Sequence, residues 1–113
     1  MADNKQYITQ PQENGTIQIS QDVIATIVTH AVGEVEGVSG LSNTSKKGWG
    51  RGLKITISQD DALSIECNVI VVYGQSVFDV AKAVQVAIGN AVLSMTGITV
   101  SAVNVNVSGI VRK

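Results

Sequence analysis

The residues best suited to binding chemistry lie in one short segment, residues 46–54, with the sequence KKGWGRGLK. The segment holds four of the eight basic residues, and no acidic residue lies between Glu36 and Asp60. Lysine and arginine contact phosphates, and an exposed tryptophan can stack on a base or lie among lipid headgroups. The segment is therefore a candidate loop for a protein partner, a nucleic acid or an anionic lipid. The alternative is a solvated loop whose tryptophan folds onto the core. The candidate residues are Lys46, Lys47, Trp49, Arg51 and Lys54.

The glycines of this segment do not predict a nucleotide site. Gly48, Gly50 and Gly52 alternate with other residues. A phosphate-binding loop needs a strand before its glycines and a helix after them, because the amides at the helix start meet the phosphate. Here the alternation of Leu53–Ile57 predicts that a strand follows instead.

The other reactive side chains have simpler explanations. His30 is the lone histidine and has no second histidine or cysteine at ligand spacing, so we expect it to be idle rather than to bind zinc. Cys67 falls on the inward side of a predicted strand, where a thiol behaves as a small apolar group. Asp60 and Asp61 lie in a predicted turn, where aspartate is common for backbone reasons. We therefore predict no enzyme activity, no catalytic residue, no metal, no cofactor and no small-molecule substrate.

Apolar periodicity gives the elements that must position these residues, in the order strand, helix, strand, strand, helix, strand. They are predicted over residues 15–19, 21–35, 53–57, 63–73, 77–95 and 100–111. Asn68, Asn104 and Asn106 imply that one face of the sheet is wet, so the helices must cover the other face. The prediction is an α+β two-layer sandwich, with two helices packed on one face of a small mixed sheet.

Length and composition predict a single domain. The chain has 113 residues, 44% hydrophobic and 15% charged, which is typical of a globule and leaves little charge for its surface. We expect residues 1–14 to form a mobile tail, residues 15–113 one domain, and residues 36–52, with five of the eleven glycines, a long loop. The net charge of −1 gives no strong field for DNA or lipid, so any such contact needs a local patch.

Surplus apolar residues predict a contact surface. Phe78, Val86 and Leu93 lie off the main apolar stripe of the second helix, and Ile70 and Val72 lie on the polar face of a strand. Apolar groups exposed in this number usually mark an interaction site, so these five are a candidate self-association surface. The alternative is a core that wraps wider than two layers. Gly89 within the helix costs about 1 kcal/mol relative to alanine and would permit close backbone packing.

Short motifs along residues 15–111 resemble one known family. They are GTIQIS at 15–20, VEGV at 35–38, RGLKI at 51–55, VVYG at 71–74 and VNVNV at 103–107. In this order and spacing they resemble the alkaline shock protein (Gls-type) family, in a short form. The resemblance implies a bacterial cytoplasmic protein of the envelope stress response. Some members self-associate, and some bind a membrane-anchored partner. The family offers no catalytic residues, and the short loop at residues 43–50 with Trp49 departs from its pattern.

The predicted function is therefore that of a non-enzymatic interaction or scaffold module, which self-associates and docks on a membrane-linked protein. No apolar stretch approaches the ~20 residues of a membrane span, and the first 14 residues lack the apolar core of a signal peptide. We therefore expect a cytoplasmic protein, which another molecule or a surface patch would have to bring to any membrane at which it works. The alternative is a protein that binds nucleic acid or anionic lipid through the basic Trp49 loop.

Overall fold

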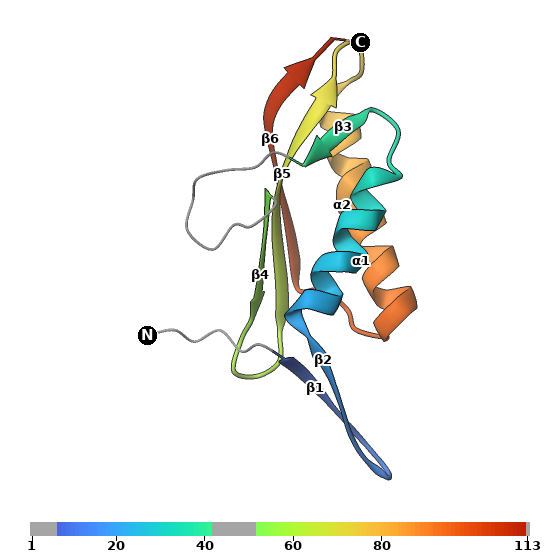
Figure 1. The fold of residues 1–113 in the computed structure, drawn as a ribbon, viewed down its shortest axis with the longest axis vertical. Coiled ribbons are helices and arrows are strands. Elements are labelled where there is room, and N and C mark those ends of the chain that lie inside the picture. The colour runs from blue at the N-terminus through green and yellow to red at the C-terminus, as the bar shows by residue number, and fades with distance from the viewer. Residues whose placement is uncertain (1–6, 42–51, 113) are drawn as a thin grey trace.

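The computed structural model of the chain describes residues 7–41 and 52–112. Helices α1 and α2 lie on one face of a sheet made of β3, β4, β5 and β6, and β1 pairs with β2 in a separate hairpin (Figure 1). The predicted two-layer α+β architecture is confirmed. In chain order the elements are β1 (Tyr7–Gln12), β2 (Gly15–Ser20), α1 (Gln21–Gly33), β3 (Val38–Leu41), β4 (Leu53–Ile57), β5 (Leu63–Val72), α2 (Val77–Thr96) and β6 (Ala102–Val111).

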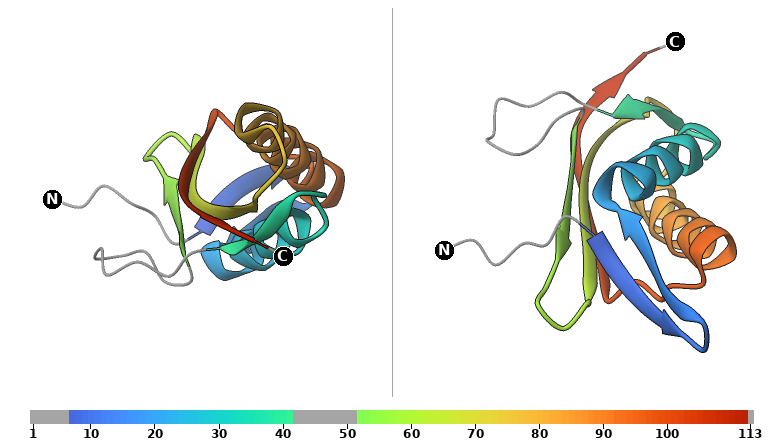
Figure 2. Two further views of the ribbon diagram at one scale, coloured as in Figure 1. Left: turned by 90° about the horizontal axis from the view of Figure 1, so that it is seen from above. Right: turned by 60° about the horizontal axis from the view of Figure 1, so that its bottom comes forward.

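Strand β5 is the centre of the sheet. It pairs in parallel with β6 over nearly its whole length, from Ser64 opposite Ala102 to Val72 opposite Val111. Its other edge is shared, because β4 pairs antiparallel with its first half and β3 pairs antiparallel with its second half. The sheet is therefore mixed, as predicted. Figure 2 separates this sheet from the two helices, which lie side by side on it.

Capping residues fix where the helices begin and end. The Ser20 hydroxyl accepts a hydrogen bond from the Val23 amide, and the Ser76 hydroxyl accepts one from the Asp79 amide, both at 3.3 Å. These bonds satisfy amides that have no partner within the first helical turn. At the end of α2, Gly97 adopts a left-handed conformation with φ of 77°. That conformation costs glycine little and stops the helix.

The core fills the space between the helices and the sheet. Its fully buried side chains alternate along β5 and recur every three or four residues along both helices, as burial on one face requires. Cys67 is among them, as predicted. The largest are Ile24, Val28, Val32, Ile57, Leu63, Ile65, Val69, Val71, Val84, Ile88 and Val92.

The prediction of a tail over residues 1–14 was wrong for Tyr7–Gln12, which is strand β1. It pairs antiparallel with β2, from Tyr7 opposite Ser20 to Gln12 opposite Gly15. Ile8 anchors it, since this side chain is only 2% exposed within the core cluster. The sequence does not reveal this strand, because Pro11 is a poor strand former and the surrounding glutamines give no apolar alternation. Residues 1–6 lie outside the described part of the chain.

The prediction of a loop over residues 36–52 was wrong for Val38–Leu41, which is strand β3. The Val72 amide donates to the Gly37 carbonyl at 2.8 Å, just before the pairing of β3 with β5 begins. The pairing is irregular between Val38 and Gly40, so the strand lacks the strict alternation that sequence analysis requires. Residues 42–51 lie outside the described part of the chain.

Candidate interaction surface

Helix α2 has one buried side and one exposed apolar side. Its buried side carries Val80, Val84, Ile88 and Val92, four residues apart, which face the sheet. By length and composition alone α2 could also cross a membrane, contrary to our expectation from the sequence. Only 22% of its apolar stretch is buried, so α2 packs through one side, with these four side chains in the core cluster. Length and composition alone are weak evidence for a membrane span.

The exposed side of α2 carries three of the five residues predicted for self-association. Phe78 is 71% exposed, Val86 53% and Leu93 49%. Large apolar side chains are usually buried on folding. Three of them exposed on a single helix form an apolar patch, which is typical of an interaction site. The structure therefore brings these three residues to one side of one helix.

Ile70 and Val72 do not join that surface. Both are half-buried on β5, and they alternate with Val69 and Val71, which face the helices. Because successive side chains of a strand point to opposite faces, Ile70 and Val72 lie on the sheet face away from α2. The five predicted residues therefore occupy two faces of the molecule rather than one.

A groove joins the exposed side of α2 to the edge strand β6. It is lined by Phe78, Lys82 and Gln85 of the helix and by Val105 of the strand. The side-chain amide of Gln85 donates to the Val103 carbonyl, with 3.0 Å between Nε2 and O. The helix and the strand thus form one continuous surface along this side of the molecule.

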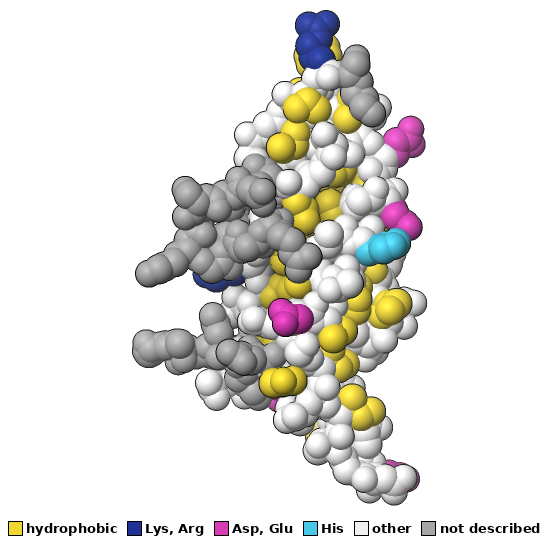
Figure 3. Space-filling view, in the orientation of Figure 1, with side chains coloured by type: hydrophobic (Ala, Val, Ile, Leu, Met, Phe, Trp, Pro, Cys, Tyr) yellow, Lys and Arg dark blue, Asp and Glu magenta, His cyan; other side chains and the backbone are white. Residues whose placement is uncertain are grey.

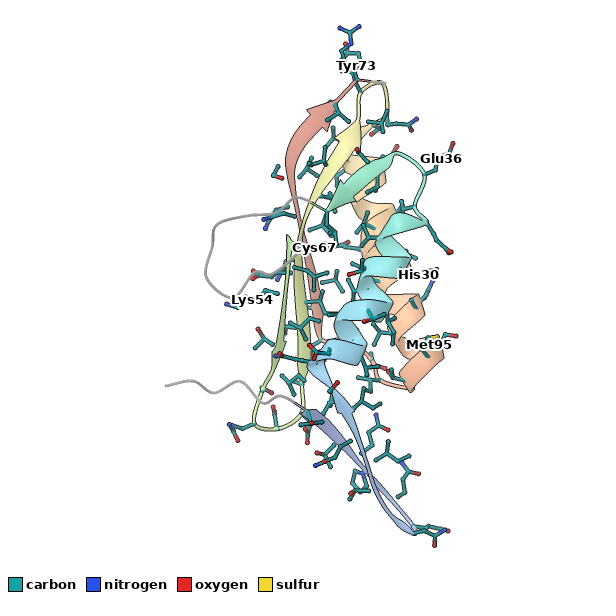
Figure 4. The ribbon with its side chains drawn as sticks, viewed as in Figure 1. His30, Glu36, Lys54, Cys67, Tyr73 and Met95 are labelled. Atoms are coloured by element: carbon teal, nitrogen blue, oxygen red, sulfur yellow. The ribbon has the colours of Figure 1, made fainter. Side chains whose placement is uncertain are left out.

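A second groove, between α1 and α2, was not predicted from the sequence. Its volume is about 580 Å³, and it is lined mainly by apolar side chains. Ala31, Ala87 and Ala91 contribute little volume, which leaves the groove open, and they are the signal that could have revealed it. His30 lies at the groove, and its Nδ1 is 3.6 Å from Glu34 Oε2. Figure 4 shows His30 and Met95 on the outer side of the helical layer, and Figure 3 shows hydrophobic side chains exposed around the histidine.

Most of the predicted basic loop lies outside the described residues, namely Lys46, Lys47, Trp49 and Arg51. The structure places only Lys54, on β4, where it lies directly opposite Glu66 of β5. Its side chain extends from the sheet on the side away from the helices (Figure 4). The charge of Lys54 therefore has an acidic neighbour in the sheet, and the described residues do not test whether the loop binds anything.

The cysteine and the two turn aspartates are held by burial or by hydrogen bonds within the fold. Burial raises the pKa of the Cys67 thiol from 9.0 to about 11, so the thiol stays protonated at neutral pH. The hydroxyl of Ser58 bonds the Asp60 carboxylate and lowers its pKa, within the turn between β4 and β5. Asp61 of the same turn has a positive φ of 64° and accepts a hydrogen bond from the Thr9 amide. Within residues 7–41 and 52–112, no three His, Cys, Asp or Glu side chains gather as metal ligands would.

Solved structures share this fold at low sequence identity. A variant of the MamM CTD superimposes with a TM-score of 0.53 and 15% identity, over 79% of this chain and 96% of that one. The nickel form of another MamM CTD variant gives 0.52 and 16%, over 79% and 98%. At such identities the likeness shows a common fold.

Relatives at higher identity cover most of the chain. The uncharacterized protein YqhY of Bacillus subtilis (strain 168) is 30% identical over 105 residues, which are 85% of this chain and 77% of YqhY. The uncharacterized protein Spy1535 of Streptococcus pyogenes serotype M6 is 33% identical over 105 residues, 88% of this chain and 81% of Spy1535. The alkaline shock protein 23 family, described as having a cell envelope-related function, matches residues 9–112. This match confirms the resemblance found in the sequence, and the chain belongs to the alkaline shock protein 23 family.

Proposed function

We propose that this protein is a non-enzymatic interaction module of a cell envelope-related process, which self-associates and docks on a membrane-linked protein. The exposed apolar side of α2, with Phe78, Val86 and Leu93, is the observation that carries the proposal. The envelope link of the alkaline shock protein family supports the site of action.

The energetics favour a protein contact on this side of α2. Full burial of a large apolar side chain contributes about 1.5–3 kcal/mol. Since these three side chains are half to seven-tenths exposed, a partner could recover about 1 kcal/mol from each. Association costs at least about 4 kcal/mol in lost freedom. Three side chains from one copy do not offset that cost, but the same three from each of two copies do, so self-association is the simplest use of the surface.

Light scattering coupled to size exclusion tests self-association. We expect wild-type protein to form an oligomer that survives high salt, because apolar contacts are not screened. The double variant Val86→Glu, Leu93→Glu should be monomeric. A matched control, Ala83→Glu with Ser94→Glu, adds the same charges to exposed positions elsewhere on α2 and should stay oligomeric. A wild-type protein that remains monomeric from about 1 µM to about 1 mM would contradict self-association.

Sedimentation with membranes tests the membrane-linked partner. We expect the protein to sediment with envelope membranes but not with the same membranes after mild protease treatment, and not with protein-free vesicles. Sedimentation with protein-free anionic vesicles would instead support direct lipid binding. Failure to sediment with any membrane would contradict docking on a membrane-linked protein.

The second candidate function is binding of nucleic acid or anionic lipid by the basic loop with Trp49. Four basic residues without an intervening acid support it. It predicts binding to single-stranded DNA that weakens steeply with salt and is lost in the Lys46→Glu, Lys47→Glu variant. Fluorescence anisotropy at low salt measures this binding, and no binding there would exclude the nucleic-acid function.

A further inference from the structure

Strand β6 presents a long free edge. Within the described residues it pairs only with β5, and its sequence, AVNVNVSGIV, contains no charge and no proline. Edge strands usually carry lysine, proline or a bulge, which prevent a further strand from pairing with them. In β6 the one irregularity lies between Val107 and Gly109, so the run Ala102–Val107 has no such protection.

The exposed side of α2 lies directly beside this edge. Phe78, Lys82 and Gln85 line a common groove with Val105, and helical spacing continues the same side of the helix through Gly89 to Leu93. Any strand added to β6 would extend the sheet below this side of α2. An element of the partner that packs on the added strand, on the same face of the sheet as α2, would then contact α2.

Gly89 indicates that this element of the partner is a helix. Outside the backbone of its own helix, a Cβ added to Gly89 would meet no atom of the described residues within 4 Å, so their packing does not require glycine there. Glycine within a helix costs about 0.5–1 kcal/mol relative to alanine. Close approach of another helix is a physical reason to retain it, because the missing side chain lets the two backbones come together.

We propose that two copies of this chain pair antiparallel through their β6 edges about a two-fold axis, so that one sheet runs through both copies and their α2 helices meet along Phe78, Gly89 and Leu93. This interface presupposes the self-association proposed above and specifies its geometry. In such a dimer both β6 edges are covered, and the assembly is closed.

The chemistry of the surface favours a second copy over a foreign partner. An uncharged edge strand fits another uncharged extended strand, and β6 of a second copy is one. A two-fold contact also places the apolar side of α2 against an identical apolar side, which leaves neither exposed. The unprotected run Ala102–Val107 is about 20 Å long, and the sheet layer and the helix layer are together about 20 Å thick. The contact therefore covers about 400 Å² on each copy, which is the size of a weak, reversible interface. We expect a dimer that dissociates on dilution.

Charges introduced on β6 test the interface. Asn104 and Asn106 are exposed, so charges there are compatible with the folded monomer. Asn104→Lys with Asn106→Lys places like charges across the proposed pairing, as does Asn104→Asp with Asn106→Asp. We expect each variant alone to dimerise at least about tenfold more weakly than wild type, and an equimolar mixture of the two to recover a mixed dimer. Native mass spectrometry identifies the mixed dimer by its mass.

A matched control adds the same charges to another strand. Gln10→Lys with Gln12→Lys lies on β1, outside the four-stranded sheet, and should dimerise like wild type. A second test is independent of β6: Gly89→Leu should weaken the dimer, whereas Gly89→Ala should raise the melting temperature of the dilute monomer. Circular dichroism checks that all variants fold.

The outcomes separate the two levels of the proposal. A wild-type protein that is always monomeric would overturn self-association itself. A wild-type oligomer that Val86→Glu with Leu93→Glu disrupts, but that neither charge variant of β6 weakens, would leave self-association standing and overturn the β6 interface. Loss of the oligomer in the β1 control alone would move the contact to the β1–β2 hairpin and also overturn it.

Discussion

The side-chain amide of Gln85 on α2 lies 3.0 Å from the backbone carbonyl of Val103 on β6 and donates a hydrogen bond to it. Helix α2 lies in the connection between β5 and β6. The bond therefore ties this connection to the strand that follows it. It therefore holds the exposed side of α2 in place over the edge strand.

Replacing Gln85 by leucine should loosen this attachment. The bond is exposed, so we expect a loss of only about 0.5 kcal/mol in the free energy of unfolding, measured in urea at a concentration where the protein is monomeric. Hydrogen exchange should become faster in β6 more than in β4. Gln18→Leu, at an exposed position of β2, is the control. Equal exchange changes in β4 and β6 would contradict a local role for Gln85.

Gly37 should tolerate no side chain. Its φ is +95°, and a Cβ there would lie 2.8 Å from Val80 Cγ2, a buried side chain of α2. We expect Gly37→Ala to destabilise the protein by about 1–3 kcal/mol, from the strained backbone and the clash together. Gly33→Ala is the control, since no atom of the described residues beyond its own helix backbone lies within 4 Å of the added Cβ. It should be neutral or stabilise by up to about 1 kcal/mol. Similar thermal shifts for both variants would contradict this account.

The first strand should contribute to stability through Ile8. This side chain is 2% exposed, whereas Ile17 on the paired strand is 52% exposed. We expect Ile8→Ala to cost about 2–4 kcal/mol, because it removes buried methyl groups and leaves a cavity. Ile17→Ala should change stability by no more than about 0.5 kcal/mol. Urea unfolding measures both, and a small effect at Ile8 would restore the original prediction of a tail.

The buried thiol should make stability fall at alkaline pH. Below pH 9 the Cys67 thiol is protonated in the folded and the unfolded chain, so it has no effect. Between pH 9 and about 11 the unfolded chain loses this proton while the folded chain, with its raised pKa, keeps it. Stability should therefore decrease by up to about 1.4 kcal/mol per pH unit over this range. Cys67→Ala should lack this component, so the difference between the two proteins across pH isolates it. A constant difference would contradict the raised pKa.

The sequence was sufficient for elements with strong periodicity and clear ends. The four-residue spacing of Val80, Val84, Ile88 and Val92 predicts α2, and Ser76 and Gly97 mark its ends. Strand β4 follows from its strict alternation, with Leu53, Ile55 and Ile57 buried. In each case local pattern and tertiary burial agree.

Elements that depend on distant pairing could not be predicted. Strand β3 has four residues and a break in register. It forms because it pairs with the second half of β5, on the edge that β4 leaves free. Strand β1 depends on Ile8, a single buried side chain within a polar segment. For the candidate surface, periodicity identified Phe78, Val86 and Leu93 as surplus on α2. Alternation also placed Ile70 and Val72 on the polar face of their strand, away from the helices. It could not show that β6 is an edge, because that depends on the order of the strands.

The central position of β5 has a kinetic consequence. Every pairing in the four-stranded sheet has β5 as one partner, so no part of that sheet can form before it. The β4–β5 hairpin is closed by a short turn, whereas Ser64 reaches Ala102 only after α2 has folded back, which makes the pairing with β6 entropically slower. The hairpin should therefore be formed in the transition state and β6 should join after it. Ile65→Val on β5 should then slow refolding, while Val105→Ala on β6 should mainly accelerate unfolding.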